Sequence, residues 1–188
     1  MRAVLLIPLL LASCHSAGSS SPYAVQSEAE RATTVAEKLS REGADLIATD
    51  PSKAEALLRD ALTKDLYYGP AHNNLGVVFL NEGKLYEAAH EFEWARKLLP
   101  GNPDPRVNLA LTLERAGRTD EAFKSYETAL EVSPEYLPAI EGAASVAMRS
   151  SRSEPRLRAW LDAIALGSPD SNWSTWAKSA RARLSAEQ

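Results

Sequence analysis

The side chains best suited to chemistry in this sequence are the single thiol, Cys14, and two imidazoles, His72 and His90. A thiol can act as a nucleophile or carry a covalent group, and imidazoles can bind a metal or transfer protons. The two histidines are 18 residues apart, however, and a zinc site needs more ligands at closer spacing. The sequence also has no glycine-rich phosphate loop, no His-Glu-x-x-His and no Gly-x-Ser-x-Gly motif. We therefore expect no enzyme activity, no metal site and no cofactor.

Cys14 lies in a context that predicts covalent modification. The positive start Met1-Arg2 precedes an apolar run, residues 3–11, which is too short to span a membrane, and Leu-Ala-Ser leads directly to Cys14. This pattern resembles the lipobox of bacterial lipoproteins. The resemblance implies that a signal peptide, residues 1–13, is removed and that Cys14 carries a diacylglyceryl group and acyl chains such as palmitate. The alternative is an ordinary signal peptide with an incidental cysteine.

The residues after Cys14 indicate where such a protein would be located. Residues 14–26 are rich in serine and glycine, a composition typical of a flexible tether. By resemblance to lipoproteins of double-membraned bacteria, His15 in place of an aspartate favours the outer membrane. Several acyl chains would anchor the protein firmly. We therefore expect a membrane-anchored lipoprotein that faces the periplasm.

Small and large apolar residues recur along the rest of the chain with a period of 34 residues. Such a period is typical of stacked helix pairs, in which small residues let two helices approach and large ones fill the space between them. Gly83 and Gly117 fall at the turn inside a pair, and Pro100 and Pro134 fall where a pair ends. The recurring positions are Ala54, Ala88 and Ala122; Gly76, Ala110 and Ala144; Leu58, Phe92, Tyr126 and Trp160; and Ala61, Ala95, Ala129 and Ala163.

The order of these residues resembles the tetratricopeptide repeat (TPR) family. The resemblance implies an all-α fold, a right-handed superhelical array of antiparallel helix pairs known as a TPR solenoid. In residues 69–102 the matching positions are His72, Leu75, Gly76, Phe79, Ala88, Phe92, Ala95 and Pro100. In residues 103–136 they are Arg106, Leu109, Ala110, Leu113, Ala122, Tyr126, Ala129 and Pro134.

Two degenerate repeats flank this pair, so the TPR domain is expected to cover residues 27–184 in four repeats. In residues 27–68 the register of the repeat pattern shifts by one residue near Gly43, within the first helix, which is expected at about residues 27–49. In residues 137–168, Arg156 replaces the small alanine and Ser168 replaces the closing proline, although Ala163 keeps its position. Terminal repeats of an array are commonly atypical because one face meets solvent.

The last segment, residues 169–184, has one apolar stripe that includes Trp173, Trp176 and Leu184. This spacing predicts a C-terminal capping helix that covers the fourth repeat. The alternative is a surface on which tryptophan side chains anchor a partner, because interfaces favour tryptophan.

Charge is distributed unevenly along the chain. The formal net charge is −4, which argues against general nucleic-acid binding. Residues 142–188, in contrast, carry seven basic and four acidic side chains. Their local basic patch is either a solvated rim of the fourth repeat or a docking site for an acidic partner or a lipid headgroup. It consists of Arg149, Arg152, Arg156 and Arg158.

The TPR resemblance also implies a partner-binding site, since the first helix of each repeat in this family lines a concave groove. Such a groove suits a short amphipathic helix or an extended peptide. Leu39 and Val107 stand where the family's clamp for a C-terminal carboxylate has polar groups, so that clamp is not expected. The implied groove residues are Asn73, Val77, Leu80, Asn81, Val107, Leu111, Glu114, Arg115, Glu141, Met148 and Arg149.

These expectations combine into one function, a periplasmic scaffold or adaptor that holds another protein of the cell envelope. By resemblance to small lipoproteins with such repeats, one alternative is a pilotin-like assembly factor for a secretin or pilus system. Another is a structural spacer that associates with itself through the helix of Trp173 and Trp176. The sequence leaves the partner and the oligomeric state open.

Overall fold

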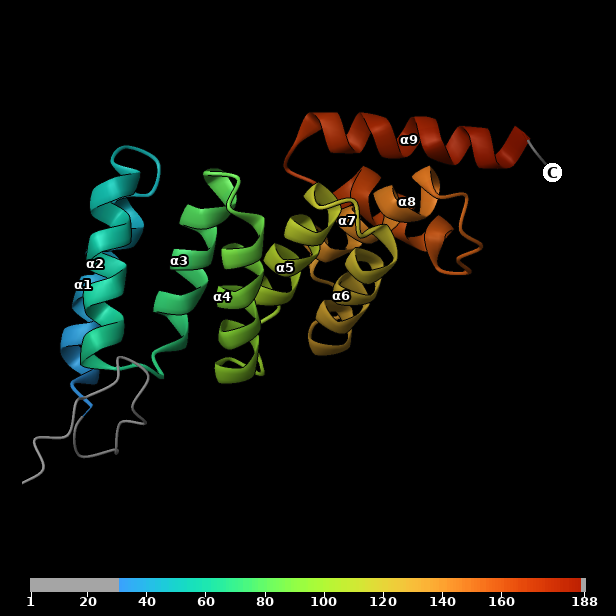
Figure 1. Ribbon diagram of the computed structural model, residues 1–188. Helices are drawn as coiled ribbons and strands as arrows, with labels where there is room; N and C mark the ends of the chain where they lie inside the picture. The colour runs from blue at the N-terminus through green and yellow to red at the C-terminus, as the bar shows by residue number, and fades with distance from the viewer. Residues whose placement is uncertain (1–30, 187–188) are drawn as a thin grey trace, which may run out of the picture.

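The computed structural model describes residues 31–186, which form nine α-helices and no strand. The expected signal peptide, Cys14 and the tether lie outside these residues. Figure 1 shows the helices standing side by side from α1 to α8, with α9 lying across the end of the row. The helices are α1 (Thr33–Leu46), α2 (Pro51–Lys64), α3 (Gly69–Asn81), α4 (Leu85–Leu98), α5 (Asp104–Arg115), α6 (Thr119–Val132), α7 (Leu137–Arg149), α8 (Leu157–Gly167) and α9 (Ser171–Ala186).

Helices α1 to α6 pack as three consecutive pairs, and each pair packs on the next, as the 34-residue period predicts, whereas α8 packs more extensively on α9 than on α7. Ala88 and Ala122 are fully buried where the two helices of a pair approach. Gly76 allows an especially close approach, because a Cβ atom there would lie 2.6 Å from the ring of Phe92 and the ring would have to shift. The expected all-α array of helix pairs is therefore confirmed.

The turns inside the pairs need backbone in the left-handed region. Gly83 and Gly117 have φ angles of 77° and 75°, as their place between two helices predicts. Ser151 stands 34 residues after Gly117 and has a φ angle of 50°, although it is not a glycine. The turn geometry thus persists into the fourth repeat after the glycine has been lost.

The first helix is shorter than expected but has the expected shift. It begins at Thr33, and residues 31 and 32, which were expected to be helical, are not. A Cβ atom at Gly43 would lie 2.9 Å from Cγ of Leu58, the same close approach that Gly76 makes in the second repeat. Since a strict period would place this contact at residue 42, the one-residue shift is confirmed.

The expectation that Ala163 keeps the position of Ala129 is wrong. Ala129 is fully buried, whereas Ala163 is exposed and Ile164 is buried instead. Helix α8 begins only at Leu157, because residues 150–156 form a loop in place of its first turn. The shortened helix contacts both α7 and α9. Its buried residues therefore fall one position later in the sequence than the repeat pattern predicts, at Ile164 instead of Ala163.

The buried apolar residues form two clusters that meet in the middle of the array. One consists mainly of residues from α1 to α4, and the other of residues from α5 to α9. Helix α5 contributes Leu109 and Leu113 to the first cluster and Val107 and Ala110 to the second. Helix α9 adds Ala177 and Ala180 to the second cluster, so it caps the C-terminal end as expected.

Candidate functional site

Polar side chains of the first helices pair from one repeat to the next. Asn108 Nδ2 donates a hydrogen bond to Asn73 Oδ1 at 3.1 Å. Arg115 Nη1 donates to the carbonyl oxygen of Leu80 at 2.8 Å. Both contacts join residues 35 positions apart, so they place the same side of α3 and α5 in one continuous row. Three of the expected groove residues, Asn73, Leu80 and Arg115, therefore lie together, joined by Asn108, which sequence reasoning missed.

Glu114 extends this row to α7 and connects it to the core. Its carboxylate forms an ion pair with Arg149 and accepts a hydrogen bond from the Tyr126 hydroxyl at 2.7 Å. Burial raises the pKa of Tyr126, and the hydrogen bond and negative charge of Glu114 raise it further. Tyr126 thus stays a neutral donor, and Glu114 is held by internal partners. Arg149 remains 59% exposed and can meet a ligand.

Apolar groove positions differ in how far they reach solvent. Leu111 is 42% exposed, and Val77 is partly buried beside the first core cluster. Leu80 and Val107 are buried, so the expectation that they are exposed groove residues is wrong. Leu80 packs in the first cluster and Val107 in the second, because neighbouring helices close over both positions. Leu111 is the large apolar side chain that this row presents most openly.

The remaining expected residues lie at the two ends of the row. Asn81 is exposed at the last turn of α3. Glu141 is partly buried on α7, and its Oε1 accepts a hydrogen bond from the Ser168 hydroxyl at 2.7 Å. Met148 is partly buried on the same helix and packs against the second core cluster.

The buried imidazole of His72 serves the packing of the second repeat. Nδ1 lies 2.6 Å from Glu91 Oε2, and Nε2 lies 2.8 Å from the carbonyl oxygen of Leu66. The ring stacks on Trp94 with a centroid distance of 5.6 Å. Both nitrogens are therefore occupied. Among residues 31–186 no group of three His, Cys, Asp or Glu side chains could hold a metal ion.

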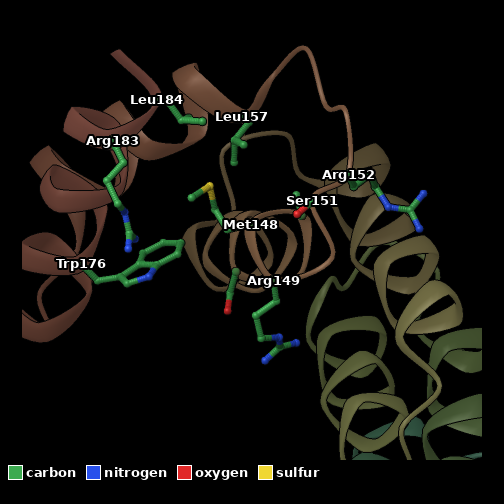
Figure 2. A pocket seen from close by; sticks show the side chains of 10 residues that line it. Met148, Arg149, Ser151, Arg152, Leu157, Trp176, Arg183 and Leu184 are labelled. Carbon is green, nitrogen blue, oxygen red and sulfur yellow. The ribbon is translucent and has the colours of Figure 1, made fainter. Parts of the chain in front are cut away.

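A cavity of about 520 Å³ lies between α7 and α9, at the C-terminal end of the row. Figure 2 shows Trp176 and Arg183 pointing from α9 toward Met148 and Arg149 on α7. The other lining residues are Ser145, Ala147, Ser151, Arg152, Leu157 and Leu184. A smaller cavity of about 270 Å³ shares Ser145 and Trp176 with it and is also lined by Asp170, Asn172 and Trp173.

The basic patch expected from the sequence consists mostly of paired side chains. Arg152 pairs with Asp120 and lies 4.5 Å from the ring centroid of Phe123, so its guanidinium turns away from the cavity, as Figure 2 shows. Arg156 pairs with Glu127 at 2.6 Å. Arg183, which sequence reasoning missed, makes no ion pair within residues 31–186. It follows Trp176 by seven residues, the spacing of one helix face, and that was the available signal.

The family comparison matches one repeat of the array. Residues 104–136 match the family model of the tetratricopeptide repeat. A comparison with curated proteins found no match. Within the described part of the chain, no helix combines the length and the hydropathy needed to cross a bilayer.

Several solved structures share the architecture of most of the array. The first TPR of Spaghetti (RPAP3), bound to the HSP90 peptide SRMEEVD, is 16% identical, with a TM-score of 0.61 over 65% of this chain and 98% of that chain. MamA is 18% identical, with a TM-score of 0.58 over 80% of this chain and 81% of that chain. An O-GlcNAc transferase mutant from Thermobaculum terrenum, which shows that such arrays also occur within enzymes, is 22% identical, with a TM-score of 0.62 over 76% of this chain and 26% of that chain. At these identities the likeness shows the fold alone. The chain therefore carries a tetratricopeptide repeat, and its array has the fold of a TPR solenoid.

Proposed function

We propose that this chain is a non-catalytic scaffold that binds a segment of another protein along the row formed by α3, α5 and α7. The observation that carries the proposal is Leu111, a large apolar side chain exposed between polar groups that hold one another in place. An apolar anchor beside fixed hydrogen-bonding groups suits a peptide, because the anchor supplies affinity and the polar groups fix orientation. The RPAP3 domain, which shares the fold, was solved with a peptide bound.

Affinity capture tests this surface. The full chain would be used to capture proteins from detergent-solubilised membranes, with mass spectrometry of what is retained. We expect Leu111→Glu to weaken capture of the specific partner about 30-fold, since losing a central anchor costs about 2 kcal/mol or more.

Tyr86→Glu is the matched control for this experiment. Tyr86 is 83% exposed and lies on α4, a second helix of a pair, so the same change there leaves the row intact. The control variant should retain the same partner as the native chain. If the Leu111→Glu variant retained the partner as well as the native chain does, the binding site would not lie on this surface.

We further propose that the scaffold is a lipoprotein held at the periplasmic face of the outer membrane, where it binds an envelope protein. The support is the short apolar run, residues 3–11, whose last residue begins the sequence Leu-Ala-Ser-Cys that ends at Cys14. Serine residues and His15 follow Cys14, a composition suited to a tether between membrane and array.

Changing Cys14→Ser should release the protein from the membrane fraction, because the thiol is the only atom in the chain that can accept the diacylglyceryl group. Fractionation of bacterial cells that make each form measures this directly. Intact-mass spectrometry of the native protein should show a chain that begins at residue 14 with the added lipid mass. A native protein that begins elsewhere, or a serine variant that stays membrane-bound, would contradict the anchor.

A further inference from the structure

The larger cavity continues the row formed by α3, α5 and α7. Arg149 belongs to both, since it pairs with Glu114 in the row and lines the cavity between α7 and α9. At about 520 Å³, the cavity falls within the range of about 300–1,000 Å³ that is usual for ligand sites. A segment bound along the row would therefore reach this cavity where the row ends at α7.

One wall of the cavity is apolar and can take a large side chain. Met148, Leu157, Trp176 and Leu184 line it, and Figure 2 shows the Met148 thioether on the α7 side facing Trp176 of α9. A methionine side chain adapts to several shapes, and tryptophan buries a large area with little loss of conformational freedom.

The charged groups that face the cavity are positive. Arg183 has no ion-pair partner in the described part of the chain, and Arg149 uses only Nη2 toward Glu114. A guanidinium presents five N–H donors in a fork that matches a carboxylate, so Arg149 keeps donors for a ligand. No carboxylate lines this cavity among residues 31–186, and Arg183 lacks the kind of ion pair that Arg149 makes with Glu114 and Arg152 makes with Asp120.

Combining these observations, we propose that the cavity between α7 and α9 binds an acidic side chain and an adjacent large apolar side chain of the partner segment. The inference rests on the function proposed above and names the chemistry of the partner. Arg183 and Arg149 hold the carboxylate, and the wall of Met148 and Trp176 holds the apolar group. A protein segment fits better than a membrane surface, because both arginines line a cavity that continues the row.

Peptide selection tests this assignment. Random 12-residue peptides displayed on phage, which have no free C-terminus, would be selected on the full chain. We expect the enriched peptides to carry Asp or Glu next to Leu, Ile, Phe or Trp. Binding of an enriched synthetic peptide should fall at least 10-fold in the Arg183→Glu variant, measured by fluorescence anisotropy. Amidation of that acid in the peptide should cause a similar loss in the native chain and no further loss in the variant.

Lys178→Glu provides the matched control, because it reverses a charge on the same helix outside the cavity. Lys178 is exposed on α9 and does not line either cavity. Its variant should bind the peptide as the native chain does. Both variants should keep native helicity by circular dichroism, since neither side chain makes an ion pair in the described residues.

The remaining outcomes distinguish a failure of the cavity assignment from a failure of the proposed scaffold function. Peptides that lose binding with Leu111→Glu but not with Arg183→Glu would leave the scaffold standing and overturn the cavity assignment. Peptides without an acidic bias would also overturn it. If no peptide is enriched on the native chain, both proposals fail. If the Cys14→Ser full chain instead sediments with phosphatidylglycerol vesicles in an Arg183-dependent way, the cavity serves a lipid headgroup and the assignment is wrong.

Discussion

Gly142→Ala is expected to lower the free energy of unfolding by about 3 kcal/mol, because overpacking a rigid core usually costs about 1–3 kcal/mol and this site has little room to relax. A Cβ atom at Gly142 would lie 2.1 Å from Cζ and 2.6 Å from the hydroxyl oxygen of Tyr126. Tyr126 is fully buried, and its hydroxyl is hydrogen-bonded to Glu114, so the ring has no free space to enter. Urea denaturation followed by circular dichroism measures the loss.

Two further variants identify the cause of that loss. Gly101→Ala is the control, since an added Cβ atom there meets no atom within 4 Å. In a Tyr126→Ala background the Gly142→Ala change should become nearly neutral, because the ring that it would strike is gone. If the two losses simply add in the double variant, the clash with Tyr126 is not the cause.

We also expect Asp65→Asn to destabilise the array by about 2 kcal/mol, because hydrogen bonds to charged groups contribute about 1.5–3 kcal/mol. Asp65 is buried between α2 and α3 and accepts hydrogen bonds from Arg31 Nε at 3.0 Å and Thr33 Oγ1 at 2.7 Å. The backbone N–H of Tyr67 donates a third, at 3.0 Å. These contacts tie the start of the first helix pair to the loop that leads into the second.

The effect of this substitution should depend on pH. Burial raises the pKa of Asp65, but hydrogen bonds from Thr33, Arg31 and the Tyr67 N–H outweigh it, and the net pKa is lowered. A carboxyl whose pKa is lower in the folded state stabilises the fold above its unfolded pKa of about 3.9, and this stabilisation is lost as pH falls through the folded pKa.

The free energies of unfolding of the native chain and the Asn variant should therefore differ most above about pH 4 and converge in stronger acid. Denaturation at a series of pH values measures the difference. Asp162→Asn is a suitable control, because it makes the same change at an exposed carboxylate on α8 that pairs with Arg181 of α9. A difference that stays constant with pH would show that the charge of Asp65 contributes nothing.

Much of the fold could be predicted because the residues that recur every 34 positions are the ones that pack between the helices. Small side chains at Ala88, Ala122 and Gly76 allow neighbouring helices to pack closely. Gly83 and Gly117 mark turns that need positive φ. These are local requirements that a single residue type satisfies, so they are visible without coordinates.

The fourth repeat and the surface were predicted less well, because they depend on where neighbouring helices lie. Ala163 kept its place in the period, but the loss of the first turn of α8 turned the buried face to Ile164. Leu80 and Val107 occupy groove positions of the family pattern, yet adjacent helices cover both. The position of a residue in the repeat determines which side of its helix the residue lies on. Whether that residue is exposed depends on how closely the next helix approaches.

The cavity between α7 and α9 could not be predicted for a related reason. Trp176 was recognised as part of an apolar stripe, but capping and docking were left as alternatives. In the structure α9 buries Ala177 and Ala180 and leaves Trp176 facing α7. Capping residues and a side chain that lines a cavity thus occur on the same helix, which no spacing rule could show.

The division of the core into two clusters determines how the array responds to local opening. Because α5 and α6 each divide their apolar residues between the two clusters, the two halves are joined through one helix pair rather than through a common centre. A linear array can fray from either end while its middle stays folded. A partner held near α9 would therefore suppress fraying at the C-terminal end and leave the first helix pair as free to open as before.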